Sequence, residues 1–186
     1  MSEMIPVLRP ILVGMPGAGK SSVARQLGQR LGVPVVDSDA VIEQRIGRSI
    51  RSFFEHEGEA AFRDLEEQVI AELTRGGAMV LATGGGAVLR RANRERLRAN
   101  GIVIYLRSTP EQIYRRLHKD TKRPLLQVVD PLARLREMFA VRDPLYRECA
   151  HFVLNARGLS LAMLVNKVVM QLDLMYPAGL GKSCAP

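Results

Sequence analysis

Cysteine, tryptophan and long apolar runs are scarce or absent in this sequence. The two cysteines, Cys149 and Cys184, are far apart and outside any C-x-x-C pattern, which argues against a disulfide framework and a zinc site. Aromatic residues make up only 5% of the chain, so there are few rings on which nucleic-acid bases stack. No run approaches the roughly 18 apolar residues of a membrane-spanning helix, and residues 1–10 lack a secretory apolar region. We therefore expect a cytoplasmic protein with no membrane partner.

Acidic residues are also few compared with basic ones. The chain has 27 lysine and arginine residues against 19 aspartate and glutamate residues, a net charge of +8, and 22 of the basic residues are arginine. This imbalance favours anionic partners, but net charge alone does not separate nucleic acid from an acidic membrane or a small phosphorylated or carboxylated molecule. We expect most of the arginines to be solvated surface charges. One such cluster consists of Arg90, Arg91, Arg94, Arg96 and Arg98.

Short apolar runs alternate with longer amphipathic stretches along the 186 residues. The apolar runs predict strands buried on both faces at residues 11–13, 33–36, 79–81, 102–106 and 151–154. The amphipathic stretches predict helices at residues 21–31, 40–46, 50–75, 90–99, 110–119, 131–148 and 159–175. This alternation indicates an α/β fold with a mostly parallel sheet.

The length is that of one compact domain, and 47% hydrophobic residues are enough to build its core. We expect this domain to span residues 1–176 and the turn-rich tail, 177–186, to fray. The stretch between the second and third strands is too long for a plain crossover helix. It predicts a helical insertion at about 38–75.

A phosphate-binding motif directly follows the first predicted strand. The segment Gly14-Met15-Pro16-Gly17-Ala18-Gly19-Lys20-Ser21 satisfies G-x-x-x-x-G-K-[ST] and leads into a helix, which is the context this motif requires. Its backbone N–H groups and the helix dipole would hold phosphate, while Lys20 reaches the β and γ phosphates and Ser21 ligates Mg²⁺. ATP and Mg²⁺ are therefore the expected cofactors. The expected nucleotide contacts from this motif are Gly14, Gly17, Ala18, Gly19, Lys20, Ser21 and Ser22.

Two carboxylates, Asp37 and Asp39, come where the second strand leaves the sheet. The carboxyl edge of a parallel sheet is where ligands bind, and a kinase needs one carboxylate near the metal and another at the attacking hydroxyl. The alternative is that Asp39 merely caps a helix beginning at Ala40. The third strand ends in Gly84-Gly85-Gly86 without an aspartate, which shifts the metal-holding role toward Asp37 and offers bare backbone to a ligand.

From about Leu8 to about Leu172 the sequence resembles the shikimate kinase family. The resemblance is carried by the phosphate loop, the D-x-D pair and four further motifs in a fixed order. Those motifs are the I-x-x-x-F-x-x-x-G-E-x-x-F-R-x-x-E stretch from Ile50 to Glu66, Gly84-Gly85-Gly86 followed by Arg123-Pro124-Leu125-Leu126, and Arg142-Asp143-Pro144-Leu145-Tyr146.

This resemblance implies a P-loop fold of the nucleoside-monophosphate-kinase type, with strand order 2-3-1-4-5 and a mobile lid at about 117–130. It also implies ATP-dependent phosphorylation of the 3-hydroxyl of shikimate by a monomer that binds no nucleic acid. Lys20, Asp39 and the lid residue Arg123 would be catalytic, and Arg123, Arg116 and Arg157 would contact the nucleotide. The implied shikimate contacts are Asp39, Phe62, Arg63, Gly84, Gly85, Gly86 and Arg142, with Ser21 and Asp37 at the metal.

Two other interpretations compete with this one. One is a kinase of the same chemistry that phosphorylates another small acceptor, such as gluconate or a nucleoside monophosphate. A different class is a non-catalytic nucleotide-binding module that holds nucleic acid through its positive charge. The presence of Lys20, Ser21, Asp37, Asp39 and Arg123 together argues against that class, because a degenerate module need not keep them.

Overall fold

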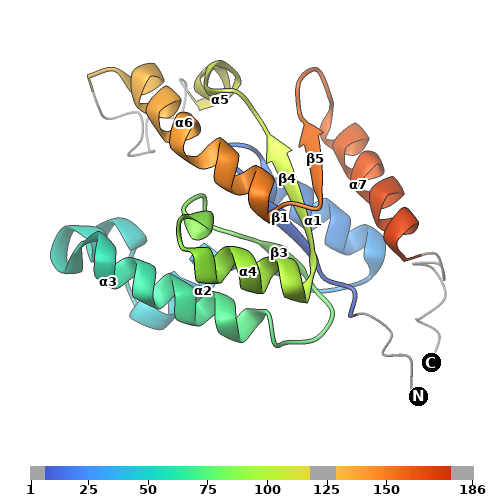
Figure 1. The fold of residues 1–186 in the computed structure, drawn as a ribbon, viewed down its shortest axis with the longest axis horizontal. Helices are drawn as coiled ribbons and strands as arrows, with labels where there is room; N and C mark the ends of the chain where they lie inside the picture. Colours follow the sequence, from blue (N-terminus) through green and yellow to red (C-terminus); the bar gives the residue numbers. More distant parts are fainter. Residues whose placement is uncertain (1–6, 118–128, 177–186) are drawn as a thin grey trace.

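One parallel sheet organises the structure, a computed structural model that describes residues 7–117 and 129–176 (Figure 1). Within those residues the sheet has five strands in the order β2-β3-β1-β4-β5, which confirms the implied topology. The strands are β1 (Pro10–Val13), β2 (Val35–Asp37), β3 (Val80–Ala82), β4 (Ile102–Arg107) and β5 (Phe152–Asn155). The helices are α1 (Lys20–Leu31), α2 (Ser38–Ile46), α3 (Ile50–Leu73), η1 (Ala87–Leu89), α4 (Arg91–Asn100), α5 (Pro110–Leu117), α6 (Pro131–Cys149) and α7 (Leu161–Met175).

Helices cover both faces of the sheet, as the continuous apolar runs predict. On β1, Leu12 packs into one core with side chains of α1 and α7, while its neighbours Ile11 and Val13 pack into a second core with α4 and α6. Figure 1 shows α1 behind the sheet, α4 and α6 in front of it, and α7 beside β5. The central strand is therefore buried on both sides and holds the phosphate-binding segment that follows it.

The insertion between β2 and β3 has a small core of its own, built on Ile42, Phe62 and Val69. Its long helix, α3, is interrupted at Gly58, whose backbone (φ 83°, ψ 171°) is not helical. The kink lets the first turns of α3 fold onto the rest, so that the Phe54 ring lies 4.6 Å from the Phe62 ring. The helix predicted at 50–75 is therefore nearly right in extent, and the structure adds the kink at Gly58.

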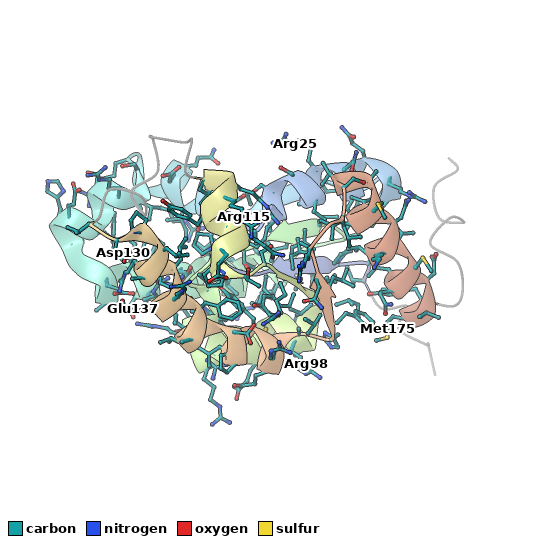
Figure 2. The ribbon with its side chains drawn as sticks, turned by 90° about the horizontal axis from the view of Figure 1, so that it is seen from above. Arg25, Arg98, Arg115, Asp130, Glu137 and Met175 are labelled. Atoms are coloured by element: carbon teal, nitrogen blue, oxygen red, sulfur yellow. The ribbon has the colours of Figure 1, made fainter. Side chains whose placement is uncertain are left out.

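Most arginines near α4 join elements, so the expectation that they are solvated surface charges is wrong for them. Arg94 is only 12% exposed and donates to Glu148 of α6 at 3.0 Å and to the Val88 carbonyl at 2.8 Å. Arg98 donates to the Ala150 carbonyl at the end of α6 at 2.7 Å (Figure 2). Arg90 and Arg96 pair with Glu67 of α3. Arg91, 81% exposed, does fit the expectation.

A buried arginine beside β1 joins the ends of two helices. Arg9 is 4% exposed, and its guanidinium donates to the Thr74 carbonyl at 2.7 Å and to the Asn100 carbonyl at 2.6 Å. A further bond reaches the Gly76 carbonyl. Thr74 and Asn100 lie at the C-termini of α3 and α4, where backbone carbonyls lack helical partners and carry partial negative charge. Arg9 therefore supplies charged donors to these helix-terminal carbonyls, of which that of Thr74 is buried.

Replacing Arg9 with glutamine is expected to lower the free energy of unfolding by about 2–4 kcal/mol, because the buried Thr74 carbonyl and two partly buried carbonyls lose a charged donor. Urea unfolding at neutral pH measures this loss. Arg91→Gln is the matched control, since its exposed helix pair with Glu95 should contribute no more than about 0.5 kcal/mol. Equal losses in the two variants would contradict the role given to Arg9.

Candidate active site

The phosphate loop occupies the turn between β1 and α1. The Lys20 side chain is buried and folds back over this loop, where its Nζ donates to the Gly14 carbonyl at 2.8 Å and to the Met15 carbonyl at 2.9 Å. The loop is therefore held in a curled form by its own lysine, and α1 begins at that lysine with its free N–H groups facing the loop.

Asp37 connects the second strand to the phosphate loop. Its Oδ2 accepts a hydrogen bond from Ser21 Oγ at 2.8 Å, and its Oδ1 accepts from the backbone N–H of Asp39 at 3.0 Å. Asp37 is thus the N-cap of α2, which begins at Ser38. The alternative in which Asp39 caps a helix starting at Ala40 is wrong, because the helix starts two residues earlier.

Asp39 does not cap α2, and its side chain faces the phosphate loop. Burial, and then the neighbouring carboxylates of Asp37 and Glu66, raise the pKa of Asp39 from its ordinary 3.8 to about 6, against the opposing charge of Lys20. A carboxylate with this pKa is ionised at neutral pH and basic enough to accept a proton from a bound hydroxyl.

These groups line one cavity of about 250 Å³. Its walls bring the phosphate loop, the acidic pair and the loop after β3 together, as predicted from their places at strand ends. The lining residues are Pro16, Gly17, Gly19, Lys20, Ser21, Ser22, Asp37, Asp39, Thr83 and Gly85.

The three glycines after β3 are in close contact with three different elements. A Cβ added at Gly84 would lie 2.4 Å from Asp39 Oδ1, and one at Gly85 would lie 2.7 Å from the Pro16 ring. A Cβ at Gly86 would lie 2.3 Å from Arg63 Nη1. A side chain at Gly85 would clash with the rigid Pro16 ring, and one at Gly84 or Gly86 would displace the carboxylate of Asp39 or the guanidinium of Arg63.

Arg63, on α3, is held by acidic partners beside this loop. Its Nη1 donates to Glu66 at 2.6 Å and its Nη2 to Glu59 at 3.1 Å. Glu66 is 1% exposed, and burial raises the pKa of its carboxyl while Arg63 opposes that rise. The sequence motif includes Glu66, but sequence reasoning missed its role, which the three-residue spacing from Arg63 could have indicated.

Phe62 and Arg142 complete this side of the cavity. Phe62 is buried, and its ring lies 5.2 Å from the Arg63 guanidinium, so it supports that arginine from below. Arg142 comes from α6 and lies near enough to Glu66 to lower the pKa of that carboxyl. Two guanidinium groups from different helices therefore flank the same buried glutamate.

A second cavity, of about 500 Å³, lies beyond the other end of the phosphate loop. Arg116 of α5 lines it and donates to the Ala18 carbonyl at 3.3 Å, which ties this helix to the loop. Arg157, from the loop after β5, lines the same cavity. The structure thus brings together the two arginines expected on the nucleotide. Arg123 and nearly all of the expected lid lie outside the described residues.

The donor set fits a magnesium ion that shares its ligands with phosphate. In residues 7–117 and 129–176 there is no group of three or more His, Cys, Asp or Glu side chains able to enclose a metal. Magnesium in nucleotide sites takes one or two protein oxygens and fills the rest of its octahedron with phosphate and water. The adjacent oxygens of Ser21 and Asp37 meet that requirement.

Comparison with known proteins places this site in a family. The model of the family described as shikimate kinase matches residues 16–173. The chain belongs to the shikimate kinase family. It is 59% identical over 172 residues to a shikimate kinase of Paracidovorax citrulli, covering 91% of this chain and 94% of that protein. A shikimate kinase of Burkholderia pseudomallei is 52% identical over 174 residues, with 94% and 95% covered.

Solved structures agree with this assignment. The shikimate kinase of Acinetobacter baumannii, solved in complex with shikimate, has a TM-score of 0.85 at 43% identity and covers 96% of this chain and 97% of its own. A gluconokinase from Sinorhizobium meliloti has a TM-score of 0.61 at 17% identity, which shows a shared fold alone. Family membership therefore decides between the expected acceptor and the alternatives considered from the sequence.

As a member of this family, the enzyme is an ATP-dependent kinase that uses Mg²⁺. It is a transferase of the shikimate pathway, which leads to the aromatic amino acids. The sequence predicts no membrane partner, and the structure tests only one part of this prediction. Among the helices of the described residues, none is both long and apolar enough to span a bilayer.

The raised pKa of Asp39 predicts opposite effects on activity and stability in this kinase. Since the folded pKa of about 6 exceeds the ordinary 3.8, the folded state binds the proton more tightly. The stability that this proton contributes is complete below about pH 4 and is lost as the pH rises through 6. Asp39→Asn, neutral throughout, should therefore unfold at higher urea than the natural enzyme at pH 8, by about 1–3 kcal/mol, and lose that advantage toward pH 4.

Activity should fall in the same variant by about 10²–10⁴ in kcat, while kcat/KM of the natural enzyme should drop as the pH decreases below 6. Asp37→Ala is the control for stability, because removing the side-chain cap of α2 should destabilise the protein. No gain in stability for Asp39→Asn at pH 8 would contradict a buried, strained carboxylate.

Proposed function

We propose that the cavity between the phosphate loop and Gly84–Gly86 binds ATP and shikimate together. The γ-phosphoryl group of ATP is transferred there to the 3-hydroxyl of shikimate, which forms ADP and shikimate 3-phosphate. The observation that carries this assignment is the meeting of the Asp39 carboxylate, the bare backbone at Gly84 and the guanidinium of Arg63 at one edge of the phosphate-loop cavity. A hydroxylated carboxylate needs these three kinds of group.

On the donor side, the loop amides and Lys20 bind the phosphates of ATP, and Arg116 and Arg157 bind the nucleotide end in the second cavity. The ammonium of Lys20, now on loop carbonyls 2.8 and 2.9 Å away, has oxygen acceptors to exchange for phosphate oxygens. When bound, Mg²⁺ neutralises charge on the phosphates, and Ser21 and Asp37 are the residues placed to hold it.

On the acceptor side, Asp39 orients the 3-hydroxyl and takes up its proton. Its pKa of about 6 keeps it ionised at neutral pH, and its position near Lys20 aims the hydroxyl at the transferred group. The backbone of Gly84, Gly85 and Gly86 contacts the other hydroxyls. Catalysis then comes mainly from positioning and charge neutralisation, as in phosphoryl transfer generally.

Arg63 and Arg142 bind the carboxylate of the acceptor. A guanidinium presents paired N–H donors in one plane, which match both oxygens of a carboxylate, whereas an ammonium offers a single point charge. The contact with Glu66 and the Phe62 ring fixes Arg63 in one orientation before the acceptor arrives. The insertion at about 38–75 is therefore the acceptor-binding part of one domain.

The remaining partner assignments follow from where the charge lies. Because every residue assigned to the site comes from one chain, we infer that a monomer is active. Several arginines that raise the net charge are already paired with Glu67 or Glu148, which weakens any broad field for nucleic acid. ATP is a substrate of the cell interior, so we place the reaction in the cytoplasm.

The assignment is tested by the acceptor kinetics of conservative variants. Purified enzyme with MgATP should form ADP when shikimate is added, well above the rate with ATP alone. Arg63→Lys and Arg142→Lys should each raise the KM for shikimate about 10-fold or more, since one bidentate pair contributes 1–3 kcal/mol, and leave the KM for ATP within about twofold.

Arg91→Lys, far from the cavity and exposed, serves as the control and should change neither constant. If both variants raised the KM for ATP as much as the KM for shikimate, the result would argue against carboxylate binding by these arginines. No shikimate-dependent ADP formation would overturn the function itself.

A further inference from the structure

Tyr146 lies fully buried on α6, and its hydroxyl is bonded to the glycine loop. The hydroxyl donates to the Gly85 carbonyl at 2.5 Å. The ring packs on Tyr105 of β4, with the two ring centroids 4.8 Å apart. A buried tyrosine needs a partner for its O–H group, and this one uses the backbone at the rim of the acceptor cavity.

The same hydroxyl is also near Arg142, one helical turn earlier on α6. Residues four apart lie on the same face of a helix, so the two side chains point to the same side. Burial raises the pKa of Tyr146, and the positive charge of the nearby Arg142 opposes that rise. The hydroxyl thus has the Gly85 carbonyl as acceptor and the Arg142 guanidinium as a neighbouring cation.

Arg63 contacts the next residue of the loop from the opposite side. Its guanidinium lies against Gly86, where a Cβ would come within 2.3 Å of Nη1, and Glu66 holds it there at 2.6 Å. The helices α3 and α6 both pack on η1, which follows Gly86 directly. The helix that carries Arg63 and the helix that carries Arg142 and Tyr146 therefore meet at this short stretch of backbone.

We propose that Tyr146 is a positioning residue that sets the spacing between Arg63 and Arg142 and so determines how well the site binds the acceptor carboxylate. The inference rests on the proposed role of these arginines. The Tyr146 hydroxyl fixes Arg142 relative to Gly85, and Arg63 is already fixed against Gly86. Without this bond, α6 and the loop can shift relative to each other, and the two guanidinium groups no longer meet one carboxylate together.

The stacked partner of Tyr146 offers a matched control. The Tyr105 hydroxyl also bonds α6, donating to Asp143 at 2.8 Å. Asp143 accepts further bonds from Arg107 at 3.1 Å and Arg147 at 2.7 Å. Among the described residues, by contrast, the Gly85 carbonyl has Tyr146 as its hydrogen-bond donor and no other. Loss of either hydroxyl keeps the ring packing, but only loss of the Tyr146 hydroxyl releases the loop.

The test compares Tyr146→Phe with Tyr105→Phe in the full-length enzyme. Tyr146→Phe should raise the KM for shikimate about 5–20-fold and leave the KM for ATP within about twofold, whereas Tyr105→Phe should change neither. The KM ratio between the carboxamide analogue of shikimate and shikimate itself should fall in Tyr146→Phe, because the loss is confined to carboxylate binding. Thermal unfolding of both variants checks that they are folded at the assay temperature.

Equal effects of the two variants on all constants would overturn the proposal, since both hydroxyls would then serve stability alone. An unchanged KM ratio in Tyr146→Phe would overturn it as well. Arg142→Lys separates this failure from that of the proposed function: if that variant raises the KM for shikimate and Tyr146→Phe does not, the arginine binds carboxylate without help from Tyr146. If Arg142→Lys leaves shikimate binding unchanged, both assignments fall. In the double variant Tyr146→Phe/Arg142→Lys, the KM for shikimate should rise no more than in Arg142→Lys alone. A rise equal to the product of the two single effects would contradict the proposal that Tyr146 acts through Arg142.

Discussion

The common direction of the five strands determines where the chemistry of this enzyme lies. Because the strands are parallel, each delivers the loop that follows it to the same edge of the sheet. The loop after β1 binds phosphate, Asp37 ends β2, the glycines follow β3, and Arg157 follows β5. The central strand carries the phosphate loop, and its neighbours carry the proposed acceptor groups on one side and the proposed nucleotide groups on the other. Residues far apart in the sequence become one site without any long excursion of the chain.

The buried carboxylates at this edge of the sheet are balanced by basic side chains beside them, but removing these charges from water costs free energy. Asp39 and Glu66 are both removed from water, and burial opposes their ionisation. Glu66 is compensated by Arg63 at 2.6 Å, so it serves as a fixed support. Asp39 has weaker compensation from Lys20, so its pKa stays raised to about 6. This difference between the two carboxylates suits one to support Arg63 and the other to the proposed uptake of a proton.

Local features of the sequence predicted most of the fold and about half of what the site contains. The phosphate loop and the glycine run are contiguous, so their chemistry is visible in the sequence alone. The start of α2 at Ser38 was not visible in the sequence. Whether Asp37 or Asp39 caps the helix depends on which carboxylate accepts the hydrogen bond from Ser21. The interhelical partners of Arg94 and the role of Tyr146 depend on contacts between distant segments. No periodicity within one helix reveals such partners.

The glycine run has a consequence for inhibition of this enzyme. Gly84, Gly85 and Gly86 press against Asp39, Pro16 and Arg63, respectively, so each position is constrained by a different neighbour. An inhibitor that makes its polar contacts with this stretch of main chain would bind backbone atoms. Its contacts there would not depend on a side chain that a substitution could remove. Resistance by substitution would then have to arise at the residues that bind the natural substrates, where it would weaken catalysis as well.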